Sequence, residues 1–114
     1  MPYESINPYD GKLLESFKEH TDKELEAAVS TAATCFTKWR HKSFAERAAV
    51  TAKAAALMRA SVDEFARPIT LEMGKRIDEA RGEVMLSADI IDYYGNHAER
   101  FLAPETLHPG SGEL

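Results

Sequence analysis

The sequence has a single cysteine, no low-complexity tract and no long apolar run. Because Cys35 has no second thiol to pair with, an intramolecular disulfide is excluded. No stretch approaches the roughly 18 to 20 consecutive apolar residues that a membrane span requires, and no charged start leads into an apolar signal segment. We therefore predict a cytoplasmic protein with no membrane partner.

Basic residues are fewer than acidic ones, 14 against 19, which leaves a formal net charge of -5. This balance argues against nucleic acid as a partner, because a phosphate backbone would be repelled by the surface. The one dense basic run is KWRHK, from Lys38 to Lys42. We interpret it as the end of a helix, where cations stabilise the negative pole of the dipole, in preference to an anion site.

The chain has 114 residues, of which 44% are hydrophobic and 29% charged, and this predicts at most one globular domain. Its first segment, YESINPYDGKLLESF, has Asn-Pro and Asp-Gly pairs between strand-like pieces. Both pairs favour turns, so we predict a β-hairpin within residues 1–20. Two Pro and two Gly near the other end predict an extended or disordered tail over residues 104–114.

Three helices are predicted from one start signal, a hydroxyl side chain followed three residues later by a carboxylate. The pairs are Thr21 with Glu24, Ser43 with Glu46, and Ser61 with Glu64. The three helices should end near Arg40, Arg59 and Gly74. Pro68 predicts a kink in the third helix because it lacks an amide donor, and Gly74 is the expected left-handed cap.

A fourth helix is predicted from Ile77 to Leu102, where apolar or small residues recur every three or four positions. This seam consists of Ile77, Ala80, Val84, Ala88, Ile91, Gly95, Ala98 and Leu102. The fold class is therefore a mainly α-helical segment, residues 21–103, that follows an N-terminal β-hairpin.

No catalytic or metal site is predicted from the residues themselves. Cys35 lies in the middle of a predicted helix with no base beside it, so we interpret it as a small packed thiol. The histidines show neither an i, i+4 pair nor a nearby cysteine, which excludes a zinc or transition-metal site; they are His20, His41, His97 and His108. The Gly-Lys of LEMGKR is no phosphate loop, because Ile69 and Arg76 stand where that loop needs Gly and Ser or Thr.

Five ordered motifs resemble the start of the aldehyde dehydrogenase superfamily. They are INPYDGKLL, FTKWR, ERAAVTAKAAALMRA, TLEMGKRIDEARGEV and DYYGNHAERFL. LEMGK and YYGNHAERFLA are most similar to the succinate-semialdehyde dehydrogenase branch. The resemblance makes residues 1–114 the N-terminal portion of an α/β, Rossmann-like NAD(P)-binding domain, whose sheet the hairpin and helices would cover.

The resemblance also implies which residues the chain does not contain. Family members use a Cys thiolate, an oxyanion-holding Asn and a Glu that activates water, with hydride transfer to NAD or NADP. These residues and the cofactor-binding glycines lie downstream of the segment, and Cys35 does not align with the nucleophile. We therefore expect no catalysis by the chain alone and no bound cofactor. Its partners would be the rest of the enzyme and the other subunits of a homo-oligomer.

A monovalent cation site is one further implication of the resemblance. In the family, backbone carbonyls just before the Asn-Pro and an acidic residue before x-Gly-Lys hold such a cation. The matching positions are Ser5, Ile6 and Glu72. Oxygen ligands of this kind suit a hard cation.

An alternative of a different class is a stand-alone helical interaction module that has no enzyme activity. Its apolar seam would then be buried by self-association or by a partner. The gene sequence after codon 114 distinguishes the two: continuation into a cysteine-bearing motif supports the enzyme, and a stop codon supports the module. For the isolated chain we expect helices that pack differently from those of a complete enzyme, or that oligomerise.

Overall fold

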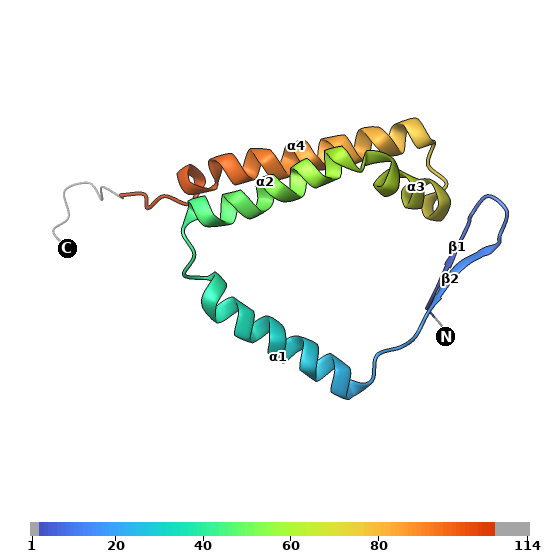
Figure 1. The fold of residues 1–114 in the computed structure, drawn as a ribbon, viewed down its shortest axis with the longest axis horizontal. Helices are drawn as coiled ribbons and strands as arrows, with labels where there is room; N and C mark the ends of the chain where they lie inside the picture. The colour runs from blue at the N-terminus through green and yellow to red at the C-terminus, as the bar shows by residue number, and fades with distance from the viewer. Residues whose placement is uncertain (1–2, 107–114) are drawn as a thin grey trace, which may run out of the picture.

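A computed structural model describes residues 3–106 of the chain, so residues 107–114 of the predicted tail lie outside the described part. A β-hairpin comes first and four helices follow it (Figure 1). Strand β1 (Tyr3–Ile6) pairs antiparallel with β2 (Leu13–Phe17), which confirms the predicted hairpin. The turn is closed by the amide of Gly11, which donates to the carbonyl of Asn7 at 2.8 Å. Gly11 has φ 69°, a conformation that glycine adopts without steric cost.

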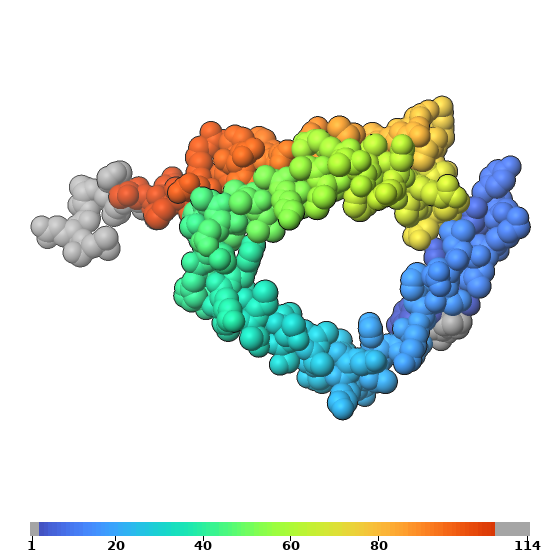
Figure 2. All heavy atoms as spheres, in the orientation of Figure 1, coloured from blue at the N-terminus to red at the C-terminus, as the bar shows by residue number. Residues whose placement is uncertain are grey.

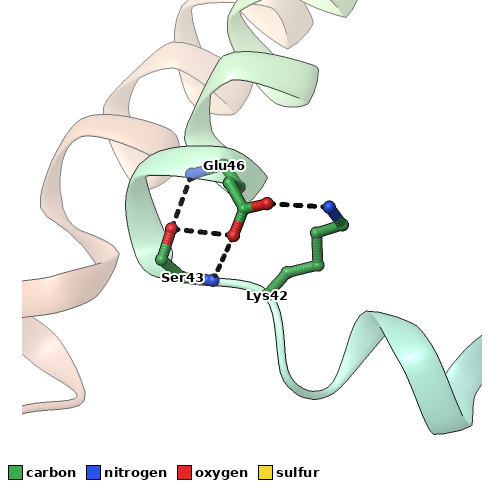
Figure 3. A network of polar contacts seen from close by, with 3 residues as sticks. All are labelled: Lys42, Ser43 and Glu46. Carbon is green, nitrogen blue, oxygen red and sulfur yellow. Dashed lines mark hydrogen bonds and ion pairs between the residues drawn. The ribbon is translucent and has the colours of Figure 1, made fainter.

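The four helices are α1 (Asp22–Trp39), α2 (Phe44–Ala60), α3 (Val62–Met73) and α4 (Ile77–Phe101). Two of the predicted capping boxes are confirmed, at Thr21 and at Ser43. At the second, the Ser43 amide donates to the Glu46 carboxylate at 2.9 Å, and the Glu46 amide donates back to the Ser43 hydroxyl at 3.2 Å (Figure 3). Each box therefore satisfies two amide donors that the helix itself leaves without acceptors.

The third predicted capping box, Ser61 with Glu64, is wrong. Ser61 has φ -115° and ψ 33° and its side chain makes no cap hydrogen bond. The reason is that Ser61 also ends α2, where its amide donates to the Leu57 carbonyl at 3.0 Å. A residue held by the preceding helix cannot take the extended conformation that an N-cap side chain needs.

The end of α3 agrees with the sequence prediction. Gly74 has φ 71° and its amide donates to the Thr70 carbonyl at 3.0 Å, as in a left-handed C-cap. Pro68 lies inside α3, and the helix continues through it to Met73. The predicted kink at Pro68 stays a prediction.

The core lies where α4 packs along α2 and α3, which together form the helical layer (Figure 1). Its buried residues are small and come from all three helices: Ala55, Ala66, Ala80, Val84 and Ala88. Three of them belong to the predicted seam of α4, so the buried face was predicted correctly. Within the described residues the seam packs on the neighbouring helices α2 and α3, and the covering of a sheet by this helical layer stays a prediction. Small side chains permit this close approach of the helix backbones.

Two arginines join the helices of this layer across their exposed edges. Arg59 of α2 donates from one nitrogen to Asp92 at 2.6 Å and from another to Asp89 at 2.7 Å, both on α4. Arg81 of α4 donates to Asp63 of α3 at 2.6 Å and to Asp78 at 3.0 Å. Hydrogen bonds to Asp89 and Asp92 raise the pKa of Arg59, so this guanidinium stays charged in the folded chain.

We expect Arg59→Glu to lower the urea midpoint of unfolding, because it places a third carboxylate beside Asp89 and Asp92. High salt should reduce the loss, since the side chain is about one-third exposed and its interactions are screened. The control is Arg67→Glu, an exposed position on α3 with no ion pair within residues 3–106. Adding Asp92→Arg to Arg59→Glu should restore part of the midpoint. Equal midpoints for both single variants would contradict the prediction.

The Glu46 carboxylate is predicted to titrate far below the ordinary range. A hydrogen bond from Lys42 at 2.7 Å, and then those from the Ser43 amide and hydroxyl, lower the pKa of Glu46 from 4.5 to about 2 (Figure 3). A lowered pKa means that the stabilisation is complete above pH 4.5 and is lost as the pH falls toward 2. Carboxyl carbon NMR should show this midpoint, and Lys42→Met should raise it. A wild-type midpoint near pH 4.5 would refute the assignment.

The described part of the chain forms an open ring, and Figure 2 shows the opening between α1 and the helical layer. Its radius of gyration is 20.8 Å, against about 13 Å for a compact domain of 100 residues. It exposes 9765 Å², whereas a compact protein of 12.7 kDa exposes about 6,200 Å². The described part of the chain therefore leaves a large apolar area unburied.

Helix α1 has no buried residue, although its apolar positions follow the predicted helical spacing. The large exposed side chains on it are Leu25, Val29, Phe36 and Trp39. Cys35 is exposed too, so the prediction of a packed thiol is wrong for this chain. Spacing places a residue on a helix face, but burial also requires a neighbouring element, and α1 lies apart from the helical layer in Figure 1.

Candidate functional site

The residues predicted to hold a cation come from two elements that pack together, β1 and α3. At this contact a Cβ added to Gly74 would lie 3.2 Å from Cγ of Pro8. Ser5 is partly buried, whereas Ile6 and Glu72 are exposed. The structure therefore brings the elements that carry Ser5, Ile6 and Glu72 side by side.

A β-bulge lies at the predicted carbonyl ligands. Ser5 is paired with Glu15, but Ile6 is paired with Leu13, so Leu14 is the extra residue of the second strand. A bulge locally disrupts the ladder of hydrogen bonds and leaves the extra residue unpaired. The backbone at this step is therefore less constrained by strand pairing than elsewhere in the hairpin.

The Gly-Lys junction between α3 and α4 is structural. Lys75 forms an ion pair with Glu83, which lies in the second turn of α4. Asp78 and Glu79 occupy the first turn of α4, where they stabilise the positive helix pole. A phosphate at this helix start would be repelled by both carboxylates, which disfavours a nucleotide site here.

An apolar groove of about 380 Å³ lies between the start of α2 and the end of α4. It is lined by Phe44, Arg47, Ala48, Thr51, Ile90, Ile91, Tyr94, Gly95, Ala98 and Leu102. The Arg47 guanidinium lies 4.6 Å from the centre of the Phe44 ring, and its Nε has no hydrogen-bond partner within the described residues. The groove suits an apolar side chain. The groove could not be predicted from the sequence, because the pairing of α2 with α4 was not predicted. Gly95 within the seam was the available signal.

The remaining candidates do not form a reactive group. Cys35 lies on α1 beside Thr31, Thr34 and Lys38, in a shallow hollow whose lining includes no histidine or carboxylate. Within residues 3–106, no three His, Cys, Asp or Glu side chains are grouped closely enough to hold a metal ion. No helix in that range combines the length and the apolar character needed to cross a bilayer.

Comparison with known sequences shows one family. Residues 1–113 match the aldehyde dehydrogenase family. A succinate-semialdehyde dehydrogenase [NADP(+)] from Deinococcus radiodurans is 40% identical over 112 residues, which are 98% of this chain and 24% of that protein. An aldehyde dehydrogenase from Paenarthrobacter nicotinovorans is 38% identical over 97% of the chain and 24% of its own length. The chain thus spans about a quarter of the length of these relatives.

Solved structures show the same arrangement of elements. Succinic semialdehyde dehydrogenase from Streptococcus pyogenes, crystallised with NADP+, superposes with a TM-score of 0.88 and 38% identity over 96% of this chain and 24% of its own. Succinate-semialdehyde dehydrogenase from Burkholderia pseudomallei gives 0.83 and 29% over 97% of this chain and 23% of its own. The expectation that the isolated helices pack differently from those of a complete enzyme is therefore wrong for this structure. The prediction of self-association is not tested by it.

Proposed function

This chain belongs to the aldehyde dehydrogenase family, and we propose that it is the first section of the NAD(P)-binding domain of an enzyme that oxidises succinate semialdehyde to the carboxylic acid. The observation that carries this proposal is the match over nearly the whole chain to succinate-semialdehyde dehydrogenases. The role of this section would be structural, because its helices would cover a Rossmann-like sheet formed by residues beyond it. We place the enzyme in the cytoplasm, as a homo-oligomer.

The open ring supports this scaffolding role. Its unburied apolar residues on α1 and on the helical layer are what a covering layer needs on its inner faces. Arg59 and Arg81 would hold α2, α3 and α4 as one unit while α1 packs separately. The alternative is a stand-alone helical module, which would have to bury the same apolar faces by self-association or against a partner protein.

The described residues do not fit a nicotinamide nucleotide. A bound cofactor would supply the hydride acceptor, but its diphosphate needs free backbone amides and positive charge. Here Lys75 is paired with Glu83, and the acidic first turn of α4 repels phosphate. Gly11 and Gly74, the glycines with positive φ, serve the hairpin turn and the helix cap. We therefore propose that the isolated chain neither binds the cofactor nor catalyses the reaction.

A chimeric enzyme tests the proposed function. The matched N-terminal residues of the Deinococcus radiodurans relative would be replaced by this chain. We expect the chimera to reduce NADP+ with succinate semialdehyde, and the isolated chain to give no NADPH. A soluble, folded chimera without activity would overturn the assignment of this section. Turnover by the isolated chain would overturn only its non-catalytic role.

We also propose that Ser5 and Ile6 carbonyls and the Glu72 carboxylate bind a monovalent cation in the complete enzyme. The support is the packing of β1 on α3 and the bulge at the carbonyls. Crystals of the chimera soaked in caesium should show anomalous scattering beside Glu72, and Glu72→Gln should weaken it. A wild-type crystal with no peak at this position would remove the site.

A further inference from the structure

Arg47 is, within residues 3–106, the only charged side chain that lines the apolar groove. The groove lies where the start of α2 meets the end of α4 (Figure 1). Arg47 is half-buried, and its Nε is shielded from solvent without a hydrogen-bond partner in that part of the chain. Burying a donor of a charged group without an acceptor destabilises a structure. Arg47 therefore needs an acceptor that the described residues do not provide.

The carboxylates that adjoin the groove do not neutralise Arg47. Glu46, its neighbour in sequence, accepts a hydrogen bond from Lys42 at 2.7 Å and is also bonded to the start of α2 (Figure 3). Glu99 follows the groove residue Ala98 on α4, but it is exposed and makes no ion pair with Arg47. A counter-ion for Arg47 must therefore come from outside residues 3–106.

The position of Arg47 in its helix makes the missing counter-ion more costly. Arg47 is the fourth residue of α2, close to the positive pole of the helix, where a cation is disfavoured. The ring of Phe44 compensates in part, since the guanidinium lies 4.6 Å from its centre. This contact also orients the guanidinium, so that little freedom remains to be lost when an anion binds.

The chemistry of the groove favours a carboxylate carried on an apolar stem. A guanidinium binds a carboxylate through charge-assisted hydrogen bonds, which are stronger than those to a neutral acceptor. The surrounding walls, which include Ile90, Ile91 and Leu102, are apolar and strengthen the attraction between opposite charges. Asp and Glu are the side chains of a protein that are ordinarily anionic at neutral pH. The volume of about 380 Å³ is at the lower end of the range for small-ligand pockets, roughly 300 to 1,000 Å³.

We propose that, in the complete enzyme, an Asp or Glu side chain from beyond residue 114 enters this groove and pairs with Arg47. The inference rests on the proposed function, because it takes the partner from the part of the enzyme that this chain does not contain. It adds the chemistry of one contact between the two parts. The carboxylate supplies the acceptor that Nε lacks, and its methylene stem lies against the apolar walls.

Butyrate, a carboxylate on a short apolar stem, tests the site in the isolated chain. We expect the NMR signals of Arg47 Nε and of the Ile90 and Ile91 methyl groups to shift with a dissociation constant in the millimolar range. Arg47→Met should weaken binding, followed at the methyl groups, by at least about tenfold, whereas the exposed control Arg67→Met should bind as the wild type does. 1-Butanol controls for the apolar stem and sodium chloride for ionic strength. Shifts no larger than in these controls, or unchanged binding by Arg47→Met, would overturn the proposal.

The chimera with the Deinococcus radiodurans relative tests the occupant of the groove. Arg47→Met should lower the melting temperature of the chimera by about 3 °C or more, because a buried carboxylate would lose its partner, and should change that of the isolated chain by less. A crystal structure of the chimera should place an Asp or Glu oxygen within hydrogen-bond distance of the Arg47 guanidinium. A backbone carbonyl or water alone at this place would overturn the proposal.

Failure of this inference can be distinguished from failure of the proposed function. A chimera that reduces NADP+ with succinate semialdehyde, but has no carboxylate at Arg47, would refute only the inference. A folded chimera without activity would refute the proposed function, while its crystal structure would still show what Arg47 contacts. If the chimera does not fold, the butyrate titration of the isolated chain decides whether the groove binds a carboxylate.

Discussion

Val84→Asp is expected to unfold the helical layer, with a loss of about 4 kcal/mol or more in the free energy of unfolding. Val84 is 3% exposed and lies in the cluster with Ala66 and Ala80, against which Met58 and Ile69 pack. No buried polar group is available there to receive a carboxylate, so the side chain must either stay protonated or bring water into the core. Urea denaturation followed by circular dichroism measures the loss.

Two controls separate the buried charge from the lost side chain. Val84→Ala removes two methyl groups and should cost about 1.5 to 2 kcal/mol. Val50→Asp places the same carboxylate on α2 where the side chain is 53% exposed, and should change stability by about 0.5 kcal/mol. If Val84→Asp cost no more than Val84→Ala, the burial of this position would be wrong.

Gly95→Ala is expected to cost about 1 to 2 kcal/mol, although alanine is the better helix former. A Cβ at position 95 would lie 2.5 Å from the Thr51 hydroxyl, closer than two such atoms can approach. Thr51 cannot rotate away freely, because this hydroxyl donates to the Ala48 carbonyl at 2.9 Å. The cost of overpacking, about 1 to 3 kcal/mol, therefore exceeds the gain of about 0.5 to 1 kcal/mol in helix propensity.

The same helix provides the control for Gly95. Nothing lies within 4 Å of a Cβ placed on Gly82, so Gly82→Ala should gain about 0.5 to 1 kcal/mol. Thr51→Ala removes the clashing hydroxyl and leaves ordinary contacts, with Cβ of residue 51 at 3.6 Å and the Ala48 carbonyl oxygen at 4.0 Å. The double variant Gly95→Ala with Thr51→Ala should thus recover the loss. Additive effects of the two substitutions would show that α2 and α4 are not this close.

Local structure could be predicted from the sequence where a few neighbouring residues determine it. The caps at Thr21, Ser43 and Gly74 and the turn of the hairpin depend on hydrogen bonds within five residues, and the caps and the hairpin are confirmed. Ser61 shows the limit of this approach. Its pairing with Glu64 has the same spacing, but the end of α2 already determines its backbone.

Partners of helix faces could not be predicted, since they depend on elements far away in the chain. The seam around Val84 has the periodicity of a buried face whether a sheet or a helix covers it. The face of α1 has similar periodicity, yet Cys35 and Val29 are exposed. The residues of the candidate cation site were chosen from the family resemblance alone. The structure adds that β1 and α3, the elements that carry them, lie side by side.

The separation of α1 from the helical layer has a consequence for cooperativity. An 18-residue helix with no buried side chain is held by its own hydrogen bonds and by the Thr21 cap, so it can open without disturbing α2, α3 and α4. Amide protons of α1 would then exchange with solvent through local opening, whereas those around Val84 would wait for global unfolding. A single melting temperature would then describe only the global unfolding of α2, α3 and α4, and not the opening of α1.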